Sequence, residues 1–185
     1  MLARTLILLF WLLPISATLR AQSLQFESLT IEQGLSQGMI YDILQTRDGF
    51  LWVTTKDGLN RYDGYNFKVF SHDPFDAFSL GDDNVEVLFE DSRGWMWVGT
   101  GSKGVDVYDP RTGLFHHINP DFPPAEQVVF TNPRTFLEGR DGSIWVQYHG
   151  RGLVRIEIPE LWRAGLLQES ELGKLTKLAH CPMPA

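Results

Sequence analysis

Three segments of this chain align with one another on a tryptophan, and a repeat of this kind leaves few folds open. Trp97 follows Trp52 by 45 residues, and Trp145 follows Trp97 by 48. Each of these anchor tryptophans is followed by valine and preceded, eight and nine positions earlier, by apolar residues. Self-similarity at a period of 20–50 residues is typical of solenoids, propellers and other repeat arrays. The aligned segments are residues 39–64, 84–110 and 132–159.

Glycines at fixed places in each segment predict where the chain turns. One glycine lies three residues before each anchor tryptophan, and another lies six or seven residues after it. The glycine before the tryptophan follows an aspartate in the first and third segments and an arginine in the second. An Asp-Gly pair fits a hairpin turn that needs a positive φ. Each tryptophan therefore lies on a short strand between two turns. The glycines are Gly49, Gly94 and Gly142 before the anchors, and Gly58, Gly104 and Gly152 after them.

The spacing of strands and turns predicts an all-β chain built of propeller blades. Strands enter and leave each glycine turn, and fourth strands are expected at Tyr65–Phe70 and Gly113–Ile118. Four-stranded antiparallel meanders of about 45 residues are the blades of a β-propeller. We predict an incomplete propeller of about three blades at 22–160, with units at about 33–74, 79–120 and 128–160. Residues 161–185 diverge from the repeat and are expected to form a helix and then the start of a further blade.

The first 21 residues have the pattern of a secretory signal peptide. Arg4 precedes an apolar run from Leu6 to Ile15, and small residues follow, so cleavage is expected between Ala17 and Ala21. The run is shorter than the roughly 20 residues that span a bilayer. An uncleaved N-terminal anchor is the alternative. We expect an exported, soluble product.

Composition and motifs exclude several classes of chemistry. Lys and Arg total 16 against 23 Asp and Glu, and this net charge of −7 disfavours nucleic-acid binding. The lone Cys181 excludes a cysteine-based zinc or iron–sulfur site. The histidines lack metal-site spacing, and neither a Gly-x-Ser-x-Gly elbow nor a phosphate-binding loop occurs. We therefore predict no catalytic residue, no metal and no cofactor.

Four short motifs carry a resemblance to a known family. They are GLSQ at 34–37, IYDI at 40–43, DGFLWV at 48–53 and DGLNRYDG at 57–64. The chain resembles, over residues 24–159, the two-component regulator propellers, the periplasmic sensor regions of large bacterial receptors. In that family, propeller blades precede a small immunoglobulin-like domain, a membrane helix and a cytoplasmic output module. The output is a hybrid histidine kinase or a diguanylate cyclase.

The resemblance implies a periplasmic sensory, ligand-binding propeller region of a transmembrane signalling receptor, present here as an N-terminal fragment without its output module. It implies a role in a two-component system or in cyclic-di-GMP signalling, with no enzymatic step in this chain. The expected partners are a small extracellular ligand such as a glycan fragment, further propeller blades and a membrane-linked signalling module. The alternatives are a propeller-fold enzyme of lyase or lactonase type and an exported structural repeat protein.

We expect different roles for two groups of aromatic residues. The anchor tryptophans lie at repeat positions, so we expect them to pack between neighbouring blades rather than to bind a ligand. Phe75, Phe78 and Phe122 lie in the connections between blades, at the ring face where propellers bind ligands. They and His149 are the candidate ligand-facing residues. The alternative places the phenylalanines over the blade beneath them and His149 in a solvated turn.

Overall fold

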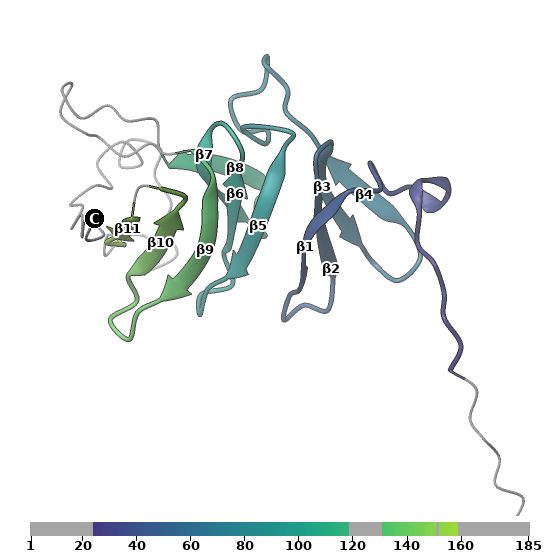
Figure 1. Cartoon of the computed structure of the whole chain (residues 1–185), viewed down its shortest axis with the longest axis horizontal. Coiled ribbons are helices and arrows are strands. Elements are labelled where there is room, and N and C mark those ends of the chain that lie inside the picture. The colour runs from purple at the N-terminus through teal and green to yellow at the C-terminus, as the bar shows by residue number, and fades with distance from the viewer. Residues whose placement is uncertain (1–23, 119–130, 151, 159–185) are drawn as a thin grey trace, which may run out of the picture.

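The computed structural model describes residues 24–118, 131–150 and 152–158. Within these residues the chain forms eleven strands, which are arranged in three antiparallel sheets (Figure 1). The first sheet consists of β1 (Ile40–Gln45), β2 (Leu51–Thr55), β3 (Gly58–Tyr62) and β4 (Phe67–Phe70). The second consists of β5 (Val85–Glu90), β6 (Met96–Thr100), β7 (Gly104–Asp109) and β8 (Leu114–Ile118). The third consists of β9 (Pro133–Glu138), β10 (Ile144–Tyr148) and β11 (Gly152–Ile156).

Each sheet is a meander in which consecutive strands pair, and we call the three sheets the first, second and third blade. The first strands β1, β5 and β9 are the closest neighbours between successive blades. In Figure 1 the blades stand side by side in chain order, as segments of an incomplete propeller. The predicted fold class is therefore confirmed, and β4 and β8 lie at the expected fourth strands. Within the described residues, no helix is long and apolar enough to cross a membrane.

The hairpin turns have positive-φ glycines, as predicted, but the turns are longer than the Asp-Gly pair implied. The φ of Gly49 is 92°, whereas Asp48 does not have a positive φ. The turn spans five residues: the amide of Thr46 donates to the carbonyl of Phe50 at 3.0 Å, and that of Gly49 donates to Thr46 at 2.8 Å. The same two bonds recur in the second and third blades. Only the glycine is therefore conformationally constrained, so arginine can replace the aspartate in the second blade.

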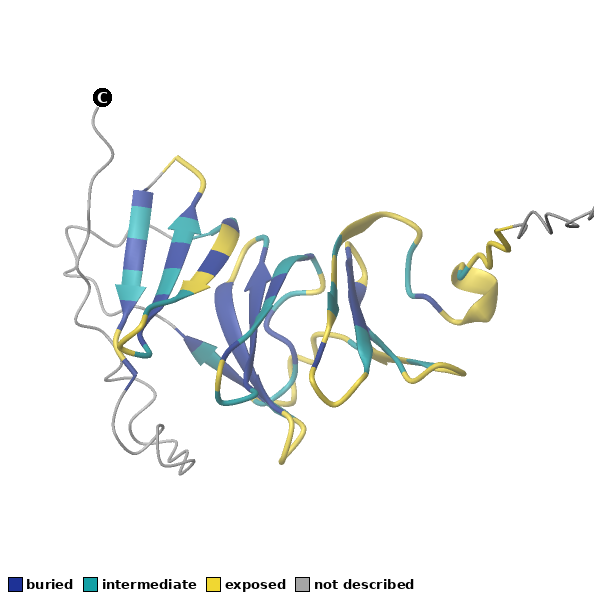
Figure 2. Ribbon diagram, turned by 90° about the horizontal axis from the view of Figure 1, so that it is seen from below, coloured by how far each residue is buried: buried dark blue, intermediate teal, exposed yellow. Residues whose placement is uncertain are grey.

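Two apolar clusters lie between the blades and hold them together. Trp97 is fully buried among residues of the third blade, including Phe136 and Val146. Trp52 is 3% exposed and contacts the second blade, with its ring 5.2 Å from that of Tyr108 in an edge-on arrangement. Large aromatic side chains contribute the most apolar area to such interfaces. Figure 2 shows the buried residues concentrated in the second blade, which has a neighbour on both faces. Trp145, on the third blade, is only partly buried.

Polar contacts join the hairpin turn of each blade to that of the next. Arg47 in the first turn donates to the carbonyls of Asp91 and Ser92 at 2.8 and 2.9 Å. In the second turn, Ser92 donates from its amide and hydroxyl to Glu138, at 2.7 and 2.6 Å. Arg93 donates to the carbonyl of Gly142 at 3.1 Å. In each case the donors lie in the earlier blade and the acceptors in the later one.

The segment before β1 covers part of the free face of the first blade. It contains the 3₁₀ turn η1 (Ile31–Gln33), which begins with a capping box at Thr30. Beyond this turn Leu35 is buried. The amide of Ser36 donates to Asn60 Oδ1 at 2.8 Å, and the Asn60 amide nitrogen donates back to Ser36 Oγ at 2.8 Å. This exchange satisfies the fully buried Asn60 side chain and fixes the segment on the blade.

The connection between β4 and β5 is tied to the second blade by a buried carboxylate. Asp106 on β7 is 1% exposed and accepts from the amide of Gly81 at 2.7 Å and from His117 Nδ1 at 2.7 Å. The hydrogen bond to Asp106 raises the pKa of His117 above its ordinary value of 6.5, although burial opposes the shift. Protonation of the imidazole therefore strengthens its bond to Asp106, the carboxylate that holds this connection.

The His117–Asp106 pair predicts how the stability of the protein depends on pH. Because the pKa of His117 is raised in the folded state, its contribution is complete below pH 6.5 and is lost as the pH rises through the raised value. The free energy of unfolding, measured with urea between pH 5.5 and 9, should fall over this range. His117→Gln keeps a donor but does not titrate, so its profile should lack this fall. Parallel profiles for the two proteins would contradict the prediction.

Substitution by alanine should destabilise the protein to different extents at two glycines with positive φ. The φ of Gly58 is 109°, and a Cβ there would lie 2.6 Å from the carbonyl oxygen of Phe70. Gly49 has a similar φ, but its Cβ would have open space. We expect Gly49→Ala to lower the free energy of unfolding by about 1 kcal/mol. Gly58→Ala should lower it by about 3 kcal/mol, because a steric clash adds to the strain. Equal losses in urea titrations would show that the clash at Phe70 relaxes.

Candidate functional site

The first strands of the three blades together border a hollow of about 430 Å³. Tyr41 on β1, Glu86 on β5 and Arg134 on β9 line it, and each lies on a strand whose side chains alternate between faces. The Tyr41 side chain is close to half exposed, so its ring is accessible to a ligand. We call this hollow the inner-strand site.

An ion pair between a half-exposed arginine and a mostly buried glutamate fixes the charged groups of the inner-strand site. Arg134 Nη1 lies 3.0 Å from Glu86 Oε2, and the Glu86 side chain is mostly buried. The amide of Asn132, assigned in the orientation that satisfies its hydrogen bonds, donates to both Glu86 oxygens at 2.7 and 3.0 Å. Asn132 has a φ of 60°, and among the described residues it is the one non-glycine with a positive φ. Asparagine adopts this left-handed conformation more readily than other non-glycine residues.

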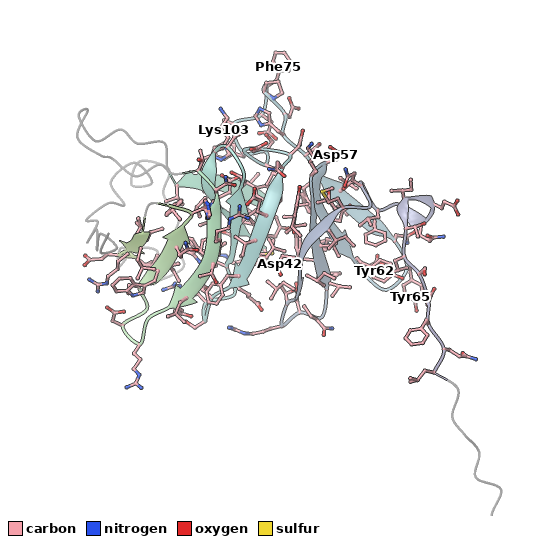
Figure 3. The ribbon with its side chains drawn as sticks, in the orientation of Figure 1. Asp42, Asp57, Tyr62, Tyr65, Phe75 and Lys103 are labelled. Carbon is pink, nitrogen blue, oxygen red and sulfur yellow. The ribbon has the colours of Figure 1, made fainter. Side chains whose placement is uncertain are left out.

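Asp42, which also borders the inner-strand site, serves to join two blades. Its Oδ2 accepts from the amide of Leu88 on β5 at 2.9 Å, and its own amide donates to Thr54 Oγ1 at 2.7 Å. Figure 3 shows Asp42 between the first and second blades. The corresponding repeat positions hold Val87 and Thr135, so among the described blades this tie exists only between the first and the second.

A second hollow, of about 330 Å³, lies between the hairpin turns of the first and second blades. We call it the interblade site. The indole of Trp52 and the side chains of Met96 and Tyr108 form its apolar wall. Its charged lining residues are Arg47, Arg93, Arg111, Asp48 and Glu90. Of these, Arg93 and Arg111 form ion pairs with Asp91 and Asp109.

Beside the interblade site, Asp91 accepts several hydrogen bonds from the second hairpin turn. This fully buried carboxylate accepts from the backbone amides of Arg93 and Trp95 and from the guanidinium of Arg93, which lies 2.6 Å away. It also accepts from the indole nitrogen of Trp97 at 3.1 Å. A buried charge satisfied in this way stabilises the turn, whereas removal of the charge takes away the closer of the two carboxylates that pair with the Arg93 guanidinium.

The predicted ligand-facing residues do not come together in either hollow. Phe75 is 96% exposed at the tip of the β4–β5 connection and points away from the blades (Figure 3). Phe78, on the same connection, is partly buried, with its ring 6.0 Å from that of His116. His149 lies exposed in the turn between β10 and β11, and its amide donates to the carbonyl of Asn132 at 3.2 Å. Phe122 lies outside the described residues.

Sequence reasoning missed the residues of both hollows, although the aligned repeats contain a signal for them. Glu86 and Arg134 are charged residues on first strands, where a purely structural blade needs none. Six residues before the anchor tryptophans, the repeats hold Thr46, Asp91 and Gly139, an unusually large change of chemistry. Across the described part of the chain, no group of three or more His, Cys, Asp or Glu side chains is placed to hold a metal ion.

Comparison with known proteins finds relatives among signalling proteins. The model of the family "Two component regulator propeller" matches residues 34–57 and 79–102. Histidine kinase P4 of Formosa agariphila is 42% identical over 74 residues, which are 40% of this chain and 5% of the kinase. The chain therefore spans about one twentieth of that relative.

Solved structures resemble the chain in fold. PorZ, a surface component of the type-IX secretion system of Porphyromonas gingivalis, aligns with 71% of this chain and 20% of its own, at 19% identity and a TM-score of 0.52. The extracellular domain of the putative hybrid two component system BT3049 from B. thetaiotaomicron aligns with 71% of this chain and 25% of its own. Its identity is 24% and its TM-score 0.47. The chain spans a fifth to a quarter of these proteins.

The Asp91 cluster predicts a large difference between two aspartate substitutions. Asp91→Asn removes the charge that neutralises Arg93 in a buried turn, and should lower the free energy of unfolding by about 3 kcal/mol. Asp57, exposed in the β2–β3 turn, is the matched control, and Asp57→Asn should change that free energy by less than about 0.5 kcal/mol. Urea unfolding of both variants tests this. A loss below about 1 kcal/mol for Asp91→Asn would contradict the assigned role of the carboxylate.

Proposed function

We propose that this chain, a member of the two-component regulator propeller family, supplies blades to the ligand-binding sensor region of an exported membrane receptor. The observation that carries the proposal is the 42% identity over 74 residues to a histidine kinase. The family match in the first two blades and the signal-peptide pattern of residues 1–21 support it. The receptor places these blades in the periplasm and its output module in the cytoplasm.

The inner-strand site is the ligand site of this proposal. An accessible tyrosine ring beside a fixed carboxylate–guanidinium pair offers an apolar face together with hydrogen-bond donors and acceptors. Sugar rings present the complementary pattern, an apolar face edged with hydroxyls. We therefore propose a glycan fragment as the ligand, bound through Tyr41, Glu86 and Arg134.

A histidine kinase is the output module that the relatives favour. The match to histidine kinase P4 supports it over a diguanylate cyclase. We assign no catalytic step to the blades themselves, because their charged clusters, at Glu86, Asp91 and Asp106, are engaged in structural hydrogen bonds. The lyase or lactonase alternative would need groups that are available for reaction.

Ligand binding can be tested with a matched pair of tyrosine variants. Tyr41 lines the inner-strand site, whereas Tyr65 is exposed in the β3–β4 turn, away from it (Figure 3). Oligosaccharides that raise the Tm of the full chain should be identified first by thermal shift. Tyr41→Ala should then weaken binding by calorimetry about tenfold or more, and Tyr65→Ala should leave it unchanged. Equal effects of the two variants would exclude the inner-strand site.

The receptor part of the proposal is tested by the size and location of the native product. An antibody against residues 24–70 should detect, in fractionated cells, a band far above 21.1 kDa in the inner membrane. A band near 21.1 kDa in the periplasm would overturn the receptor assignment. It would favour a free binding module or a structural repeat protein.

A further inference from the structure

The two joints between the blades are built from the same repeat positions. Trp52 packs against the second blade and Trp97 against the third. We call the side of a blade that bears the anchor tryptophan its leading face, and the opposite side its receiving face. A joint is therefore one leading face packed on one receiving face. On the receiving face of the second blade, the apolar residues that share a cluster with Trp52 include Leu88, Met96, Val98, Tyr108 and Phe115.

The first blade has a complete receiving face that no described blade covers. The rings of Tyr62 and Phe67 lie 4.7 Å apart on it, and the corresponding rings of the second blade lie 5.0 Å apart. Ile43 is 55% exposed, whereas its counterpart in the second blade is 7% exposed. Figure 3 shows Tyr62 on the side of the first blade away from the second. The positions that correspond to the five residues above hold Ile43, Leu51, Val53, Tyr62 and Phe67.

The segment before β1 lies on the first blade as the β4–β5 connection lies on the second. Leu35 and Leu80 both lie seventeen residues before an anchor tryptophan, and both are buried. The residue after Leu35 donates its amide to Asn60 Oδ1 at 2.8 Å. The residue after Leu80 donates its amide to Asp106 Oδ2, at the same repeat position, at 2.7 Å. Since this arrangement on the second blade leaves room for a leading face, the receiving face of the first blade is formed in advance.

The third blade presents the matching leading face. Arg155 Cζ lies 5.8 Å from the ring centre of Trp145, the same distance at which Arg61 lies over Trp52. Leu137, eight residues before Trp145, is 64% exposed. The residues at this position in the first and second blades pack against the apolar clusters of the two joints. Within the described residues, no blade covers this face of the third blade.

The hairpin turns at the two ends of the array also match. In the first joint Arg47 donates its amide to the carboxylate of Glu90 at 3.0 Å, and the corresponding bond of the second joint is 2.7 Å long. The third turn holds the exposed Arg140 at the donor position, and the first blade holds Gln45 at the acceptor position. A glutamine side-chain oxygen accepts a hydrogen bond as a carboxylate oxygen does. The two ends can therefore form the same turn contact.

We propose that the receiving face of the first blade binds the leading face of the third blade in a second copy of this chain. Trp145 and Leu137 of one copy pack on Ile43 of the other, and the Arg140 amide donates to Gln45. The two faces lie at opposite ends of the array, so the contact is head-to-tail (Figure 1). Two copies of three blades give about six, within the four to eight that typically close a ring, so we expect a closed dimer. The inference is independent of the inner-strand site.

Sedimentation of the full chain tests this self-association. The unmodified chain should sediment as a dimer at about 100 μM. Ile43→Glu and Leu137→Glu each bury a charge in the joint, from opposite sides, and each should raise the Kd of the dimer at least tenfold. Both residues are more than half exposed within one copy, so neither substitution should lower the Tm. Phe75, 96% exposed at the tip of a connection, is the control, and Phe75→Glu should leave the dimer intact.

A mixture of the two variants tests the head-to-tail geometry. Ile43→Glu keeps an unmodified leading face, and Leu137→Glu keeps an unmodified receiving face. Each variant alone should be monomeric, whereas an equal mixture should form dimers through the one joint that carries neither charge. A contact between two like faces would be lost in only one of the variants, and mixing would not restore it.

Three results would overturn the proposal. A monomeric full chain would do so, and it would favour a further blade of a longer product as the partner of the first blade. A dimer that only one of the two variants disrupts would show that like faces meet. A mixture of the two folded variants that stays monomeric would show that the leading face of the third blade does not bind the first blade.

Discussion

The structure depends on the burial of two tryptophans, Trp52 and Trp97, each against the blade that follows its own. A small antiparallel sheet has two faces to cover and no helix layer to cover them, so a neighbouring sheet must do so. Trp97 is completely buried only because the third blade lies over it, and the second blade is the best buried because it has two neighbours. The stability of any one blade is therefore shared with the blades beside it.

The same dependence explains which parts of the fold could be predicted from the sequence. Trp52, Trp97 and the glycines before them occupy repeat columns because every blade needs the same core residue and the same turn, so strands and turns follow from the alignment. The five-residue turn was not predictable, since an Asp-Gly pair is also compatible with a shorter turn. The role of Asp106, which pairs with His117 and accepts from Gly81, was not predictable either. It joins a blade to a connection whose sequence does not repeat.

The residues of the candidate sites could not be predicted from the repeat in the same way. The sequence directed attention to Phe75 and Phe78 in a connection, whereas the inner-strand site combines Tyr41, Glu86 and Arg134 from three blades. Only the packing of one blade on another brings these residues together, so no local pattern could predict the group. The interblade site was closer to prediction: the contrast between Thr46 and Asp91 is visible in the alignment, but its meaning depends on where the tryptophan nitrogen lies.

The contacts between hairpin turns give the array a direction, with consequences for how such a chain can evolve. Each earlier turn carries the donors and each later turn the acceptors, from Arg47 to the second blade and from Ser92 and Arg93 to the third. A blade copied in tandem by gene duplication would meet a donor turn on one side and an acceptor turn on the other. The array can thus gain blades that use the interface already present, and single repeat positions can diverge afterwards, as Thr46 and Asp91 have.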